Sequence, residues 1–237
     1  MRLLALLIIA AAACVSLAGC GSKLRATSAQ AIAEAEKIEN PSVAWGRIKA
    51  AKDELYLLCA EGDTFRSLCD APIADLITAE GVYIQAAAAN GDAAAVRVLY
   101  ERGDLEAAQN RLAPAILKAA KETTDPNILF AAAKIFGDGN SVPRNTRQQA
   151  AYLAQAWRLG DMESVGALAV ALEAFGDYPN AYLWSLRCTN GCQRRATVQL
   201  RYLERGLSRD QILSIQQMAL DTSHTDVGPT MKRTERR

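Results

Sequence analysis

The sequence predicts an all-α protein, organised as a helix-turn-helix repeat α-solenoid (an α/α superhelix). Three observations support this prediction. Apolar residues recur at helical spacing through most of the chain, and no segment shows the alternation of a strand. The helical segments are too short to bury their apolar faces alone, so each needs a similar neighbour. Gly-Asp pairs, suited to left-handed helix ends and N-caps, recur between segments, beginning at Gly62, Gly91, Gly103, Gly160 and Gly176.

The first twenty residues have the composition of an export signal. Arg2 is a short basic region, residues 3–15 are an apolar run, and Leu17-Ala18-Gly19-Cys20 closes the segment. The run is too short for a good membrane-spanning helix. Its end resembles the bacterial lipobox, which implies removal of residues 1–19 as a signal peptide and acylation of Cys20. An ordinary secretory signal with a chance cysteine is the alternative.

The residues after Cys20 bear on localisation. Gly21 and Ser22 stand where known inner-membrane lipoproteins carry a retaining Asp, so in a Gram-negative host the resemblance implies outer-membrane anchoring, facing the periplasm. Loss of residues 1–19 removes one basic residue from 27 and leaves 26 acidic residues unchanged. A neutral chain has no broad field for nucleic acid or an anionic surface, so the lipid is the expected membrane contact.

Four cysteines remain after the signal and the acylation site are set aside. An even number in an exported protein favours disulfides over metal ligation. Four cysteines allow three pairings, and the favoured one joins neighbours across a turn: Cys59 with Cys69, and Cys188 with Cys192. The second pair needs the chain to leave helical geometry at Gly191. Free structural thiols are the alternative, and no zinc site is expected because the chain has no Cys-x-x-Cys pair and its single His falls in the expected tail.

Helix signals divide the first half of the chain. Residues 20–40 are expected to be a lipidated tether that becomes a first helix, and residues 41–220 the repeat domain. Asn40 and Pro41 start a helix with Trp45, Ile48, Leu55 and Leu58 on its apolar face. The next helices are expected to begin at Asp70-Ala71-Pro72, at Asn90-Gly91-Asp92 and at Gly103-Asp104. Pro114 falls inside the last pattern and predicts a kink or a break.

Residues 126–161 form the best-defined repeat. Two Ala-rich helical segments flank the loop Gly139-Asn140-Ser141-Val142-Pro143, and Asp125 precedes the first. The block resembles the Sel-one-like repeat, a relative of the tetratricopeptide repeat, at Ala132-Ala133, Phe136, the loop, Asn145, Tyr152, Ala156 and Gly160. Ala133, Ser141 and Asn145 depart from the family pattern, and Asn145 should still cap a helix as Asp does. The resemblance implies a protein-binding fold and no reaction.

The last part of the chain continues the helical pattern. Helices are expected after Asp161, from Tyr178 to near Cys188, and over residues 193–205. Ser208-Arg209-Asp210-Gln211 is a capping box that starts a final helix. Residues 221–237 are polar, contain Pro and Gly and end in basic residues, so they are expected to be a disordered tail.

Catalytic signals are weak. The single histidine, His224, falls in the expected tail, which argues against His-dependent nucleophilic or metal sites. Loop 137–141 lacks the Lys of a phosphate loop and the ligand spacing of a calcium loop. Two carboxylate pairs could in principle serve a hydrolase, Glu101 with Asp104 and Glu163 with Glu173. Charges at these spacings usually mark solvated faces, so no catalytic residue, metal or cofactor is expected.

An aromatic set with nearby arginines is the candidate binding surface. Tyr152 and Tyr182 are expected to reach a groove with their polar ends, and Arg158 and Arg187 lie beside them in sequence. Trp157 and Trp184 either join this surface or pack between repeats. The sequence therefore predicts a non-enzymatic adaptor that binds an envelope protein or peptide, as a subunit of secretion or conjugation machinery. Two alternatives stay open: a peptidoglycan-remodelling enzyme or its activator, and a surface-exclusion or immunity lipoprotein.

Overall fold

The computed structural model describes residues 22–60, 66–188 and 196–228, and every element of regular structure in these residues is a helix. The chain forms two compact units that divide between Leu99 and Tyr100. The prediction of an all-α fold is confirmed for the described residues. Residues 1–19 and Cys20 lie outside them. None of the described helices combines the length and the apolar composition that crossing a bilayer requires.

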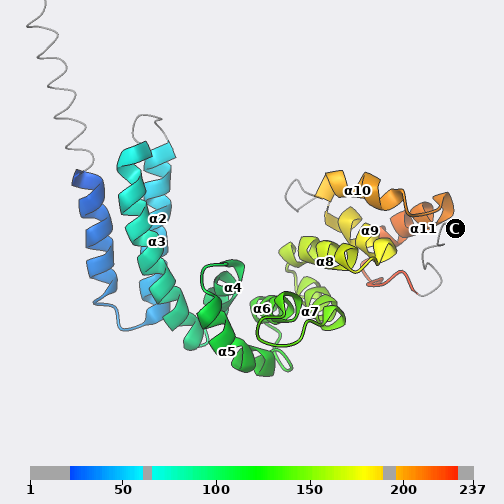
Figure 1. The fold of residues 1–237 in the computed structure, drawn as a ribbon, viewed down its shortest axis with the longest axis horizontal. Coiled ribbons are helices and arrows are strands. Elements are labelled where there is room, and N and C mark those ends of the chain that lie inside the picture. The colour runs from blue at the N-terminus through cyan, green and yellow to red at the C-terminus, as the bar shows by residue number, and fades with distance from the viewer. Residues whose placement is uncertain (1–21, 61–65, 189–195, 229–237) are drawn as a thin grey trace, which may run out of the picture. The chain divides into compact units, whose positions relative to one another are not determined.

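The N-terminal unit, described from residue 22 to Leu99, is a bundle of three antiparallel helices followed by the start of a fourth (Figure 1). A helix over residues 22–35 leads to α2 (Pro41–Ala60), α3 (Arg66–Ala89) and α4 (Ala93–Glu101). Alanines make up much of its core, and such small side chains let helix backbones approach closely. The buried cluster consists of Ala31, Ala35, Ala44, Ile48, Ala51, Leu55 and Leu76.

Local chemistry accounts for where α2 and α3 begin. The Asn40 Oδ1 accepts hydrogen bonds from the N–H groups of Ser42 (2.9 Å) and Val43 (3.3 Å), which confirms Asn40 as the cap of α2. The start expected at Asp70 is wrong, because α3 begins at Arg66 and continues through Pro72. Pro72 lacks an N–H, so one helical hydrogen bond near the start of a long helix is lost without ending it.

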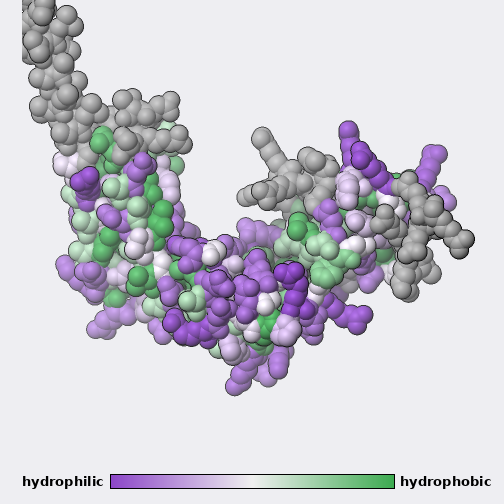
Figure 2. All heavy atoms as spheres, in the orientation of Figure 1, coloured by the Kyte–Doolittle hydropathy of each residue, from purple (hydrophilic) through white to green (hydrophobic). Residues whose placement is uncertain are grey.

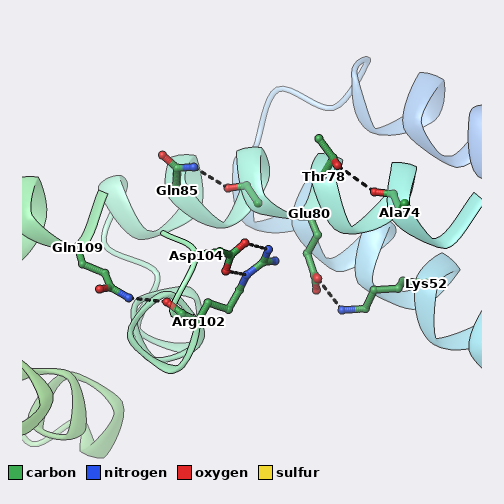
Figure 3. Close-up of polar contacts among 9 residues, drawn as sticks. Lys52, Ala74, Thr78, Glu80, Gln85, Arg102, Asp104 and Gln109 are labelled. Carbon is green, nitrogen blue, oxygen red and sulfur yellow. Dashed lines mark hydrogen bonds and ion pairs between the residues drawn. The ribbon is translucent and has the colours of Figure 1, made fainter. Parts of the chain in front are cut away.

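One disulfide and one ion pair join α2 to α3. Cys59 and Cys69 form a disulfide with their Cα atoms 6.2 Å apart, as the sequence favoured. Further along, the Lys52 ammonium lies 2.5 Å from the Glu80 carboxylate, with side chains 18% and 6% exposed (Figure 3). Removing one partner of such a shielded pair would leave an uncompensated charge. Cys192 lies outside the described residues, so the Cys188–Cys192 pair stays a prediction.

Three of the Gly-Asp pairs end a helix in the same way. At the end of α3, Gly91 has a φ of 86°, its N–H donates to Ala88 O, and the Asp92 N–H donates to Ala87 O. This is the Schellman pattern, which satisfies the last free carbonyls of a helix. The Asp92 carboxylate then accepts the Ala95 N–H at 3.0 Å and caps α4. The same turn ends α7 at Gly160-Asp161 and α8 at Gly176-Asp177, with glycine φ values of 95° and 75°. Asp177 caps the next helix by accepting the Asn180 N–H at 3.3 Å, whereas Asp161 accepts the Glu163 N–H at 3.3 Å from one residue before the N-cap position of its helix.

The pair at Gly103 is different. Its φ is not positive, and Asp104 pairs with Arg102 at 2.6 Å (Figure 3) instead of capping a helix. The following helix, α5 (Glu106–Ala119), begins after Leu105 without a side-chain cap. Of the kink or break expected at Pro114, the break does not occur, since α5 continues through Pro114, which lies on an exposed face. The pair at Gly62 lies outside the described residues.

The C-terminal unit, described from Tyr100 to residue 228, stacks short helices in chain order (Figure 1). In it α5 contacts α6 (Pro126–Asp138), which pairs with α7 (Thr146–Arg158), and α7 contacts α8 (Glu163–Ala174). Next, α9 (Tyr178–Arg187) packs against α8, α10 (Ala196–Glu204) and α11 (Arg209–Leu220). The helices from α5 to α10 therefore bury their apolar faces against their neighbours in sequence, and α11 packs back against α9.

Caps confirm the predicted limits of the central repeat and of α11. The Asp125 side chain accepts the Asn127 N–H at the start of α6, and Asn145 accepts the Gln148 N–H at the start of α7. Ser208 and Gln211 form the capping box expected at α11.

The segment after α11 does not behave as the solvated tail expected from residue 221. Val227 is buried in a cluster with α9 and α11 residues, and its N–H donates to the Asn180 Oδ1 at 2.9 Å. Asn180 also donates to Asp226 at 3.4 Å. Val227 and its hydrogen bond to Asn180 thus hold this segment against the unit. The polar composition of residues 221–237 gave no indication of this contact. Residues 229–237 lie outside the described residues.

Candidate functional site

A shallow pocket of about 580 Å³ lies between α5 and the loop that joins α6 to α7. On the helix side it is lined by Asn110, Pro114, Leu117, Lys118 and Lys121. These residues are spaced i, i+4, i+7, i+8 and i+11, so they form one face of α5 and of the residues just after it. Because Pro114 has no N–H, the helical hydrogen bond to the Asn110 carbonyl is not formed on this face.

The loop supplies the other wall through Asn140, Ser141 and Val142. Gly139 ends α6 in the left-handed conformation, with a φ of 75°, and the Asn145 N–H donates to Phe136 O at 3.0 Å. These two contacts fix both ends of the loop. The Ser141 hydroxyl is hydrogen-bonded to the Asn110 Oδ1 and ties the loop to α5.

The pocket combines an apolar floor with a polar, basic edge. Ala113, Leu117 and Val142 supply apolar surface, while Asn110 and Asn140 offer amide groups. Lys118 and Lys121 are exposed at the edge. An ammonium donates up to three hydrogen bonds and accepts none. The arrangement therefore suits a peptide segment that carries an apolar side chain next to a carboxylate.

Tyr182 does not reach a groove, contrary to the expectation from sequence. Its side chain is 0% exposed, and its hydroxyl donates to Glu204 at 2.8 Å and accepts from Gln216 at 3.1 Å. Desolvation raises the pKa of Tyr182 and the bond to Glu204 raises it further, while the Gln216 bond opposes them. The phenol stays a donor and links α9 to α10 and α11.

Arg187 also has a structural position. Its guanidinium carbon lies 4.9 Å from the ring centre of Trp157 and 4.8 Å from that of Trp184, and the two rings meet edge to face at 4.8 Å. The Nη2 donates to the carbonyls of Asp221 (2.7 Å) and Met218 (3.2 Å) at the end of α11. Burial lowers the pKa of Arg187 and Asp221 opposes this effect. Trp157 and Trp184 therefore pack between helices and do not join a binding surface, which decides between the two interpretations that the sequence left open.

Tyr152 and Arg158 are less enclosed but remain engaged. Tyr152 is half-buried and stacks on Phe136 with ring centres 6.0 Å apart. Arg158 is exposed and donates from Nη2 to the Thr225 hydroxyl at 3.1 Å. The four predicted binding residues therefore do not come together as one groove. Three of the four, Tyr182, Arg187 and Arg158, instead contact α11, residues 221–225 or α10.

The structure gives the positions of both carboxylate pairs named from the sequence. Glu163 and Glu173 lie at opposite ends of α8, and ten residues of helix separate their Cα atoms by about 15 Å, more than the roughly 5–10 Å of paired glycosidase carboxylates. The hydrogen bond from Arg102 lowers the pKa of Asp104, which opposes a role as general acid. Within residues 22–60, 66–188 and 196–228, no three His, Cys, Asp or Glu side chains gather as metal ligands.

The sequence contains patterns for both walls of the pocket, although the aromatic residues had pointed to a different binding surface. The loop 139–143 stood out as a motif, but its contact with α5 requires knowledge of helix packing. The stripe from Asn110 to Lys121 at helical spacing is readable from sequence alone and marks the facing surface. Comparison of the chain with family models, with curated proteins and with solved structures finds no match.

Proposed function

We propose that this protein is a non-enzymatic adaptor, a lipoprotein anchored in the outer membrane through Cys20, whose helical repeats bind an envelope protein or peptide. The observation that carries the proposal is the pocket between α5 and the α6–α7 loop, because it offers a fixed, partly apolar recess edged by two lysines. The partner chemistry that fits it is an acidic peptide segment. In this proposal the chain is one subunit of a secretion or conjugation assembly.

The order of helix contacts supports a solenoid. The hairpins α6–α7 and α8–α9 follow each other with α7 against α8. The Schellman-plus-Asp device recurs at the α7–α8 and α8–α9 junctions. A repeated turn of fixed geometry stacks helices in a regular direction, which is how α-solenoids produce extended binding surfaces. This agrees with the Sel-one-like resemblance of residues 126–161.

An in-cell cross-linking pull-down tests the adaptor role. The parent protein should recover one envelope protein, and Lys118→Glu/Lys121→Glu should lose it because the edge of the pocket then repels an acidic segment. Lys134→Glu/Arg201→Glu makes the same charge change at exposed or half-exposed positions that do not line the pocket, and should retain the partner. Equal recovery with both double variants would remove the pocket from the proposal. Recovery of peptidoglycan fragments instead of protein would favour the remodelling alternative.

A further inference from the structure

One end of the N-terminal unit exposes three consecutive apolar side chains. Tyr56, Leu57 and Leu58 are 46%, 71% and 55% exposed, although Leu58 would be expected on the core face by its spacing from Leu55. Successive residues of a helix are about 100° apart around its axis. These three side chains therefore cover most of the helix surface that is not on the side of the buried Leu55. We call them the α2-end patch. A single exposed apolar side chain needs no explanation, but three consecutive ones at a helix end call for one.

The register of the first helix against α2 places this patch level with residues 23–25, close to the start of that helix. The Arg47 Nη2 lies 2.6 Å from the Glu34 carboxylate, and the two helices are antiparallel (Figure 1). Ten residues along α2 from Arg47 is Leu57, and ten residues back from Glu34 is Leu24. Both helices rise by about 1.5 Å per residue, so Leu57 and Leu24 are level. Leu24 and Cys59 indeed pack against the same core cluster.

The predicted acylation site, Cys20, is four residues before Leu24 in the sequence and two before Ser22, the first residue that the structure describes. The chain from Cys20 to Ser22 spans at most about 7 Å when extended. If the acyl chains of Cys20 are in a bilayer, as the proposed function requires, the end of the bundle that carries the patch must lie at the membrane surface. Figure 2 shows apolar surface on the visible face of this unit up to that end.

We propose that the α2-end patch is a lipid-contact site, in which Leu57 and Leu58 enter the lipid interface of the membrane that holds Cys20. Tyr56 is suited to the same position, since tyrosine is enriched where apolar and aqueous regions meet. The contact would add burial of apolar side chains to the acyl anchor. It would also orient the bundle, with its helix axes directed away from the membrane. This inference rests on the proposed lipid anchor.

Photo-cross-linking in the lipidated full chain tests the contact. Benzoylphenylalanine replaces either Leu58 or Val43, and the acylated protein is reconstituted into phosphatidylethanolamine–phosphatidylglycerol vesicles. Val43 is the matched control because it is 56% exposed on the same helix, and its separation of fifteen positions from Leu58 places it about 22 Å further from the proposed surface. Mass spectrometry identifies the adducts and reads the modification of Cys20 in the same sample.

The expected result is lipid adducts at position 58 and none at position 43. Adducts only with protein at position 58, whether a second copy or another chain, would overturn the lipid contact while leaving the anchor intact. Equal lipid labelling at both positions would overturn it as well, because the axial orientation is then wrong. An unacylated Cys20 in protein isolated from cells would contradict the proposed function itself, and the contact with it.

Discussion

Arg187 connects three parts of the C-terminal unit through a single side chain. Its guanidinium contacts both Trp157 and Trp184, and one nitrogen donates to two carbonyls at the end of α11. A planar, weakly hydrated cation can stack on aromatic rings and donate hydrogen bonds at its edge at the same time, which an ammonium cannot do as well. Among the residues that the structure describes, the buried Nε and Nη1 of Arg187 have no hydrogen-bond partner, so stacking on the two tryptophan rings accounts for more of its contacts than hydrogen bonding does.

Replacing Arg187 with Met should lower the free energy of unfolding by about 1–2 kcal/mol, because cation–π contacts and two charge-assisted hydrogen bonds are lost. Urea denaturation followed by the tryptophan fluorescence of the unit measures this change. Arg158→Met is the control, since Arg158 is exposed with one hydrogen bond, and it should change the free energy by no more than about 0.5 kcal/mol. Equal effects of the two substitutions would show that the Trp-Arg cluster does not stabilise the unit.

Individual side chains show where sequence reasoning succeeded and where it stopped. Asn40, Asp125, Asn145 and the Ser208–Gln211 box were predictable because a cap acts within three residues along the chain. Tyr182 was misplaced because its burial depends on α10 and α11, more than twenty residues away. Val227 was missed for the same reason. Contacts that close over a long sequence separation leave no local pattern.

At the scale of elements, the Gly-Asp junction sets how closely consecutive helices follow one another. Glycine in the left-handed region lets two N–H groups turn back onto the helix that ends, and the next residue caps the helix that begins. No linker residues are needed beyond the dipeptide and one or two neighbours. The sequence marked five such pairs, and three of them end a helix with a positive glycine φ. The φ of Gly103 is not positive and Asp104 pairs with Arg102, a difference that the Gly-Asp dipeptide alone does not reveal.

Gly160→Ala and Gly103→Ala separate these two kinds of junction. An added Cβ meets no atom within 4 Å at either position, so the two differ mainly in backbone conformation. Gly160 has a φ of 95°, and its replacement should destabilise the C-terminal unit by about 1 kcal/mol. Gly103→Ala should be neutral or stabilising by up to about 1 kcal/mol, since alanine restricts the unfolded chain. Thermal unfolding of the two variants in parallel checks this, and a loss of stability at position 103 would contradict the assignment.

The disulfide is an element-scale constraint on the α2–α3 hairpin. Replacing Cys59 and Cys69 together with Ala should lower the stability of the N-terminal unit by about 2–3 kcal/mol, because the unfolded chain regains the freedom of the closed loop. Hydrogen exchange at amides of α2 and α3 should quicken while amides of α7 to α9 keep their protection. Unchanged exchange in α2 and α3 would show that the hairpin is held without the disulfide.

On the scale of the whole molecule, the fold class followed from periodicity, but the division into two units did not. The N-terminal unit packs long helices through alanines and an enclosed Lys52–Glu80 pair, whereas the C-terminal unit stacks short helices around tryptophan, tyrosine and leucine. The apolar residues recur at helical spacing in both units, so the sequence pattern does not distinguish the two kinds of packing. Each wall of the pocket left a pattern in the sequence, but the contact between them did not, because the walls come from α5 and a loop about twenty residues later.

A binding scaffold on a lipid tether requires an acylated cysteine at the mature N-terminus, and the chemical state of that residue can be measured directly. Intact-mass and peptide mass spectrometry of protein isolated from its own membranes should find Cys20 as the first residue, carrying diacylglyceryl and N-acyl groups. Cys20→Ser should abolish the modification and release the protein from the membrane fraction. A mature chain that begins elsewhere, or an unmodified Cys20 in protein that still fractionates with membranes, would contradict the account.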